Sequence, residues 1–200
     1  MELDNDEHRR RAQRHQQGFE RKRAAARQEK GLLMVYTGPG KGKTTAAFGM
    51  GLRVLGHGGR LGVVQFIKGA LDSAERGIFL QQPGCDFQVV GEGYTWNTQD
   101  KARDMATAAK GWREAQRMLD DPAFAMVILD ELNVVLHYGY LDLEEVLAVF
   151  AARRPMLHVV CTGRNAPPAL IELADLVSEV RAVKHPFREQ GVKAQAGVEF

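Results

Sequence analysis

The stretch that decides the fold is residues 32–49, which read LLMVYTGPGKGKTTAAFG. Its first part, Leu32 to Tyr36, is an apolar run that follows Gly31 and is too short for a helix. Such a run is typical of a buried strand. A glycine-rich turn comes next, and helix-forming residues follow from Lys43 onward. In the order strand, glycine loop, helix, backbone N–H groups and the positive helix end can surround a phosphate. The stretch therefore predicts a phosphate-binding loop.

The glycines of this loop let the backbone turn its N–H groups toward phosphate oxygens, while Lys43 supplies charge and Thr44 a metal-facing hydroxyl. Against the pattern G-x-x-x-x-G-K-[ST], Thr37 stands at the first glycine position, so the loop is a variant. A glycine- and lysine-rich turn without a ligand is the alternative. We expect ATP to be bound by Thr37, Gly38, Pro39, Gly40, Lys41, Gly42, Lys43, Thr44 and Thr45.

Two adjacent carboxylates follow another apolar run. Residues 126–129 read MVIL, and Asp130 and Glu131 come directly after them. At the end of a central strand these acids would lie beside the loop, where they could hold Mg²⁺ together with Thr44 and so make a bound triphosphate tolerable. Acids after a strand also commonly cap helices, which is the structural alternative for both residues.

Short apolar runs and helical stretches alternate along the rest of the chain. The predicted strands are 32–36, 61–66, 87–90, 126–129, 158–162 and 176–183, and the predicted helices are 43–56, 100–120, 142–152 and 167–174. A stripe through Met105, Ala109, Trp112, Ala115 and Leu119 makes Trp112 a core residue. This alternation predicts an α/β fold of three layers, with a mostly parallel sheet flanked by helices and ligands at the carboxyl ends of the strands.

Composition divides the chain into an arm, residues 1–30, and a body, residues 31–200, that is long enough for one sizeable core. The arm holds nine Lys and Arg against six Asp and Glu, and the body eighteen against nineteen. Residues 6–29 favour helix but have a thin apolar stripe, so the arm is expected to be helical or disordered.

Several classes of protein do not fit this composition. A nucleic-acid binder would usually carry basic residues and aromatics across the folded body as well, and that pattern is missing. There is no long apolar run and no signal sequence, so we expect a cytoplasmic protein that does not contact the membrane. The two cysteines, Cys85 and Cys161, are expected to be packing residues in a reducing compartment.

The loop and five blocks after it resemble, in the same order, the ATP:corrinoid adenosyltransferases of the P-loop type. The blocks are VVQFIKG at 63–69, GEGYTW at 91–96, LDELN at 129–133, CTGRNAP at 161–167 and VKHPF at 183–187. The likeness spans residues 31–200. Tyr94 stands where the family often has phenylalanine, which keeps the ring and adds a hydroxyl.

The resemblance implies an enzyme in which reduced cobalt of a corrinoid attacks C5′ of ATP and the whole triphosphate leaves, in the synthesis or salvage of adenosylcobalamin. It gives catalytic roles to Lys43, Thr44 and Glu131, and it makes Tyr94 and Trp96 candidates for the rings that replace the lower ligand of cobalt, although aromatics so arranged are as often core. Arg164 would reach phosphate or form a surface salt bridge.

The same resemblance implies further partners and movements. These are an arm that closes over the active site as a lid, a homodimer, and a reduced flavoprotein as electron donor.

Two other functions fit parts of the sequence. An ATPase or phosphotransferase with a P-loop would use the same loop, with Glu131 orienting water. A nucleotide-gated binding module would use the basic arm to contact nucleic acid or a partner.

Overall fold

The computed structural model describes residues 2–67, 74–91 and 100–198. The chain divides into two compact units, Met1–Lys30 and Gly31–Phe200. In the first unit, helix α1 (Glu2–Ala25) forms, and the side chains described in this unit are all exposed. The arm is therefore helical in this structure. Among the described residues, no helix is both long and apolar enough to cross a membrane.

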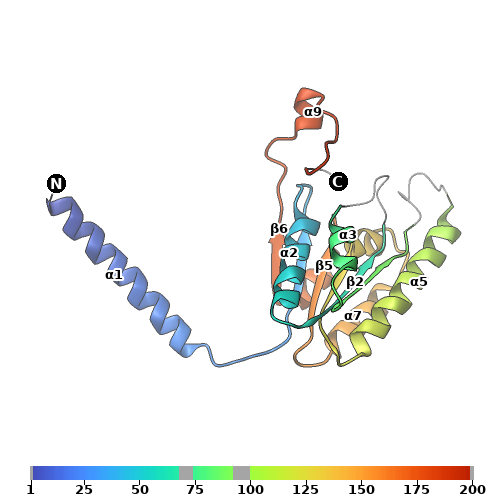
Figure 1. The fold of residues 1–200 in the computed structure, drawn as a ribbon, viewed down its shortest axis with the longest axis horizontal. Coiled ribbons are helices and arrows are strands. Elements are labelled where there is room, and N and C mark those ends of the chain that lie inside the picture. Colours follow the sequence, from blue (N-terminus) through green and yellow to red (C-terminus); the bar gives the residue numbers. More distant parts are fainter. Residues whose placement is uncertain (1, 68–73, 92–99, 199–200) are drawn as a thin grey trace. The chain divides into compact units, whose positions relative to one another are not determined.

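A parallel sheet forms the centre of the second unit (Figure 1). Its strands, in the order β3-β2-β4-β5-β1-β6, pair in parallel throughout the described chain. Their bounds are β1 Leu33–Thr37, β2 Arg60–Gln65, β3 Cys85–Val89, β4 Phe124–Asp130, β5 His158–Thr162 and β6 Leu176–Glu179. Each overlaps a stretch predicted as a strand; β3 and β4 begin two residues earlier than predicted, and β6 is clearly shorter, since it ends at Glu179.

Helices cover both faces of the sheet. The helices described in the second unit are α2 Lys43–Gly56, α3 Ala74–Leu80, α5 Lys101–Asp120, α6 Leu132–His137, α7 Leu143–Ala151, α8 Pro168–Leu173 and α9 Pro186–Gln190. Four of them match predicted helices, whereas α3, α6 and α9 were not predicted.

Alternate residues of the strands point into two separate hydrophobic clusters. In β4, Val127 and Leu129 pack with residues of α5, α6, α7 and α8, while Met126 and Ile128 pack with residues of α2 and α3. The sheet is thus buried on both sides, and the three-layer α/β prediction is confirmed.

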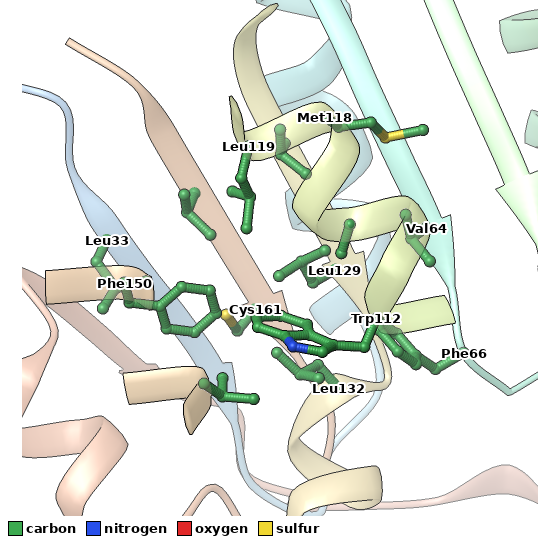
Figure 2. Close-up of a cluster of buried hydrophobic side chains, with 14 of the residues drawn as sticks. Leu33, Val64, Phe66, Trp112, Met118, Leu119, Leu129, Leu132, Phe150 and Cys161 are labelled. Atoms are coloured by element: carbon green, nitrogen blue, oxygen red, sulfur yellow. The ribbon is translucent and has the colours of Figure 1, made fainter. Parts of the chain in front are cut away.

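The larger cluster includes Trp112 of α5 (Figure 2). Its ring meets Phe150 edge to face at 6.0 Å between centroids, and its Nε1 donates to Glu145 Oε1 at 3.0 Å. Trp112 is a core residue, as predicted. The prediction for Met105 was wrong: it is exposed, because the buried stripe of α5 begins one turn later, at Ala108.

Both cysteines are free thiols that pack among apolar residues. Cys161 is fully buried in β5, and burial raises the pKa of its thiol well above the usual value. Burial also raises the pKa of Cys85 to about 11. Neither thiol is therefore ionised near neutral pH, which fits the predicted packing role.

Candidate active site

The glycine loop connects the end of β1 at Thr37 to the start of α2 at Lys43. Gly38 and Gly42 have φ of +96° and +106°, in the left-handed region that favours glycine. Gly42 occupies the N-cap position of α2, so no side chain caps this helix. The first N–H groups of α2 can therefore donate to an anion above the loop.

The loop rests against the chain that follows β6. The N–H of Gly40 donates to the carbonyl of Val180 at 2.7 Å. A Cβ added at Gly40 would lie 2.7 Å from the carbonyl oxygens of Val180 and Arg181, and one at Gly38 would lie 2.6 Å from that of Val180. Side chains at these two positions would push the loop away, so residues 180–181 help to set its shape.

Lys43 is buried under this loop, and its Nζ donates to the carbonyl of Gly40 at 2.6 Å. Burial lowers the pKa of Lys43, and the positive charges of Arg164 and Lys41 lower it further; Glu131 and Asp130 oppose the shift. An ammonium group with little water around it interacts more strongly with an anion than an exposed one does. Lys43 is thus suited to bind phosphate.

Asp130, at the end of β4, joins three neighbouring elements through its carboxylate. Its Oδ1 accepts from the hydroxyls of Thr44 at 2.8 Å and Thr162 at 2.7 Å, and its Oδ2 accepts from Nε2 of Gln65 at 3.0 Å. Only 2% of Asp130 is exposed. The buried carboxylate therefore fixes the hydroxyl of Thr44 at the start of α2.

The sequence motifs assign no role to Gln65 or Thr162. Each is a polar residue at the carboxyl end of an apolar strand, and β2 and β5 lie on either side of β4. Polar residues that end parallel strands gather at one edge of the sheet, so the sequence indicates where Gln65 and Thr162 lie but not that they meet Asp130.

Glu131 has an unusual backbone conformation, with φ of +63°, and its N–H donates to the Thr162 hydroxyl at 3.0 Å. It occupies the N-cap position of α6, but its side chain makes no capping hydrogen bond. The helix-cap alternative therefore does not describe it. Burial raises the pKa of Glu131 to about 7, and the charge of Asp130 adds to this, while Lys43 and Arg164 oppose it.

Arg164 lies on the loop after β5, and its side chain is exposed. Its positive charge lowers the pKa values of both Lys43 and Glu131, so Arg164 lies near these two residues at the carboxyl ends of the strands. The loop is tied to β1, because the N–H of Ala166 donates to Oγ1 of Thr37 at 3.2 Å. The hydroxyl of Thr37 thus contacts the 163–166 loop.

The structure brings together Lys43, Thr44, Asp130, Glu131 and Arg164 of the predicted site. Four residues of the predicted loop are exposed: Pro39, Lys41, Gly42 and Thr45. Two predicted aromatic residues lie outside the described residues: Tyr94 and Trp96.

The oxygen atoms of Thr44, Asp130 and Glu131 are of the kind that Mg²⁺ prefers. The described ranges contain no group of three or more His, Cys, Asp or Glu side chains that could hold a metal by themselves. A hydroxyl, two carboxylates and the oxygens of phosphate or water fit Mg²⁺, which usually keeps several such ligands in nucleotide sites. These oxygen ligands are therefore of a type that fits the predicted Mg²⁺.

The raised pKa of Glu131 predicts that Glu131→Gln stabilises the unliganded protein at high pH. The folded protein keeps a proton on Glu131 up to about pH 7, whereas the unfolded chain releases it near the ordinary value of 4.5. The wild-type free energy of unfolding should therefore fall as pH rises across this window, and glutamine removes that fall. We expect the variant to be more stable by roughly 2 to 3 kcal/mol at pH 8 and about equally stable at pH 4.5.

Urea unfolding at the two pH values measures the difference. The matched control is Glu172→Gln, an exposed side chain of α8, whose effect should be the same at both pH values. An equal effect of Glu131→Gln at pH 4.5 and pH 8 would contradict the raised pKa.

Comparison with known proteins gives a consistent result. The model of the family "ATP:corrinoid adenosyltransferase BtuR/CobO/CobP" matches residues 29–200. The corrinoid adenosyltransferase of Pseudomonas aeruginosa is 51% identical over 196 residues, covering 94% of this chain and 96% of that protein. The enzyme of Escherichia coli K12 is 44% identical over 198 residues, covering 99% and 100%, and CobA of Salmonella typhimurium is 48% identical over 177 residues, covering 88% and 89%.

Among solved structures, the flagellar accessory protein FlaH of Methanocaldococcus jannaschii aligns with a TM-score of 0.50 at 12% identity, covering 76% of this chain and 71% of FlaH. That likeness concerns the fold alone. The family match and the near full-length relatives show that the chain belongs to the BtuR/CobO/CobP family of ATP:corrinoid adenosyltransferases.

Proposed function

We propose that ATP binds on the loop of residues 37–45 and that the chain transfers its 5′-deoxyadenosyl group to the reduced cobalt of a corrinoid, with release of triphosphate. The chain is an enzyme of the corrinoid adenosyltransferase type. The observation that carries this conclusion is the family match over residues 29–200, which includes the glycine loop, both acids after β4 and Arg164.

The reaction forms a cobalt–carbon bond at C5′ and breaks the C5′–O bond, whose electron pair leaves with the triphosphate. Negative charge therefore grows on the leaving group as the bond breaks. The buried ammonium of Lys43 and the N–H groups of the loop and of α2 would stabilise that charge more in the transition state than in the ground state. Because the nucleophile is the cobalt of the substrate, no Ser, Cys or Lys nucleophile is needed.

Thr44, Asp130 and Glu131 are the residues that would hold Mg²⁺. The ion, when bound, supplies positive charge to the triphosphate. The Thr44 hydroxyl donates a 2.8 Å hydrogen bond to Asp130. A lone pair of the Thr44 oxygen therefore stays available to coordinate Mg²⁺. Glu131 adds a second carboxylate next to Lys43, whose charge favours its ionised form.

Further parts of the proposal rest on the sequence. Tyr94 and Trp96 would occupy the lower face of the corrinoid, and residues 1–30 would close over bound substrate. A homodimer, a reduced flavoprotein donor and a cytoplasmic location stay predictions.

A product assay tests the proposed reaction. With ATP, Mg²⁺, a corrinoid and a strong reductant, we expect inorganic triphosphate and a light-sensitive cobalt–carbon product in equal amounts. Neither product should form when the corrinoid is left out. If ADP and phosphate form instead, at a rate that does not depend on the corrinoid, the transferase assignment fails and an ATPase remains.

A further inference from the structure

Asn133 links the two segments that lead into the glycine loop and the 163–166 loop of the active site. It lies in the first turn of α6, its side chain is fully buried, and its Nδ2 donates to the carbonyls of Tyr36 at 3.1 Å and Gly163 at 3.0 Å. In the sheet, Tyr36 of β1 lies opposite Thr162 of β5. The amide therefore joins the two strands at the point where they separate into the glycine loop and the 163–166 loop.

Within the described part of the chain, only the NH₂ group of the Asn133 amide forms hydrogen bonds. Its Oδ1 is buried, and no residue in the described ranges donates a hydrogen bond to it. The neighbours Leu132, Val135 and Leu136 make α6 an apolar helix of the core. A buried acceptor without a partner costs free energy, so a polar residue here needs a reason beyond packing. We infer that asparagine is needed here because its NH₂ group donates hydrogen bonds to the carbonyls of Tyr36 and Gly163.

The 163–166 loop lies close against Asn133. Gly163 has φ of +128°, and a Cβ added there would be 3.0 Å from Cβ of Asn133 and 3.2 Å from Oε2 of Glu131. The loop has a second tie, from the N–H of Ala166 to Oγ1 of Thr37. Arg164 lies between these two ties, so its backbone is fixed on both sides relative to β1.

We propose that Asn133 is a positioning residue that sets Arg164 relative to the glycine loop, so that the guanidinium meets the phosphates held there. This inference rests on the proposed function, because it assigns the phosphate as the partner of Arg164. The side chain of Arg164 is exposed and long, so the place of its charge depends on where the backbone of the loop is held. Asn133 would act through Arg164 and would not touch the substrate.

A double-mutant cycle with Asn133→Ala and Arg164→Ala tests the proposal. We expect each variant to raise KM for ATP about 10-fold, with kcat changed by less than about 3-fold. The double variant should have nearly the KM of Arg164→Ala alone, because Asn133 has no further effect once Arg164 is gone. KM for the corrinoid should change little in all three variants.

The matched control is Val135→Ala, which shortens a buried apolar side chain of the same helix and removes no hydrogen bond to the 163–166 loop. It should lower Tm at least as much as Asn133→Ala and leave KM for ATP within about 2-fold. If Asn133→Ala does not fold, Asn133→Leu replaces it in the cycle, since it removes the same two hydrogen bonds and keeps the branched shape.

Three results would overturn the proposal. Multiplicative effects, with KM raised about 100-fold in the double variant, would mean that Asn133 acts by another route. A lower Tm with a normal KM for ATP in Asn133→Ala would show that Asn133 has a structural role only. A normal KM for ATP in Arg164→Ala would show that Arg164 does not contact the phosphates. None of these depends on the product, so a wild-type enzyme that made ADP would refute the proposed function separately.

Discussion

Lys43→Ala is expected to lower kcat/KM for ATP by about 10³-fold. The variant removes the buried ammonium under the glycine loop, and no other described lysine or arginine is buried beside the loop to replace it. Most of the loss should appear in kcat, because the ammonium stabilises the departing triphosphate more than bound ATP. Formation of triphosphate, followed at saturating corrinoid and reductant, gives both constants.

The folded state should survive this change. Burial lowers the pKa of Lys43, so its charge is not favourable for folding by itself, and its removal should leave Tm equal or higher. Lys110→Ala, an exposed lysine of α5, controls for the loss of one positive charge and should retain normal kinetics. A loss of less than about 10-fold in the Lys43 variant would contradict the assigned role.

Asp130→Asn is the second change with a large expected effect, a loss of about 10² to 10³-fold in kcat/KM for ATP. All three partners of the carboxylate are donors, namely the hydroxyls of Thr44 and Thr162 and the amide of Gln65. Asparagine replaces one acceptor oxygen with a donor NH₂ group and removes the negative charge. Either the Gln65 amide must flip or a threonine hydroxyl must rotate away, so the Thr44 hydroxyl is held less rigidly.

This prediction also has a metal readout. If Asp130 and Thr44 hold Mg²⁺, the variant should need a much higher Mg²⁺ concentration to reach half of its maximal rate. Asp86→Asn is the control, since Asp86 also accepts hydrogen bonds, from Gln88 and Arg117, but belongs to β3 at the edge of the sheet. An unchanged Mg²⁺ dependence in the Asp130 variant would remove Asp130 from the metal site.

Much of the fold could be predicted because the strands are buried on both faces. Such strands are short apolar runs that stand out from the sequence without any knowledge of their neighbours. The short helices α3, α6 and α9 were missed, because five to seven residues show little of a helical period, although α8, with six residues, lies within the predicted helix 167–174. The strand predicted over 176–183 ends at Glu179 because its partner β1 ends at Thr37, the residue paired with Glu179, and the chain continues from there into the glycine loop.

The site was predictable where its chemistry is local in the sequence. The glycine loop and the adjacent pair Asp130 and Glu131 are recognisable by themselves. The partners of Asp130 are not, because Gln65 is 65 residues away and Thr162 is 32 residues away. Their meeting depends on β4 lying between β2 and β5, and the alternation of strands and helices does not give that order.

The contact of Gly40 with Val180 and Arg181 has a consequence for protein synthesis. The ribosome makes the loop and its lysine early, but the segment against which they rest emerges only near the end of translation. A nascent chain that stops before β6 has the phosphate-binding residues without the backbone that shapes them. On the proposed function, we expect the finished polypeptide to bind ATP and its unfinished precursors not to bind it.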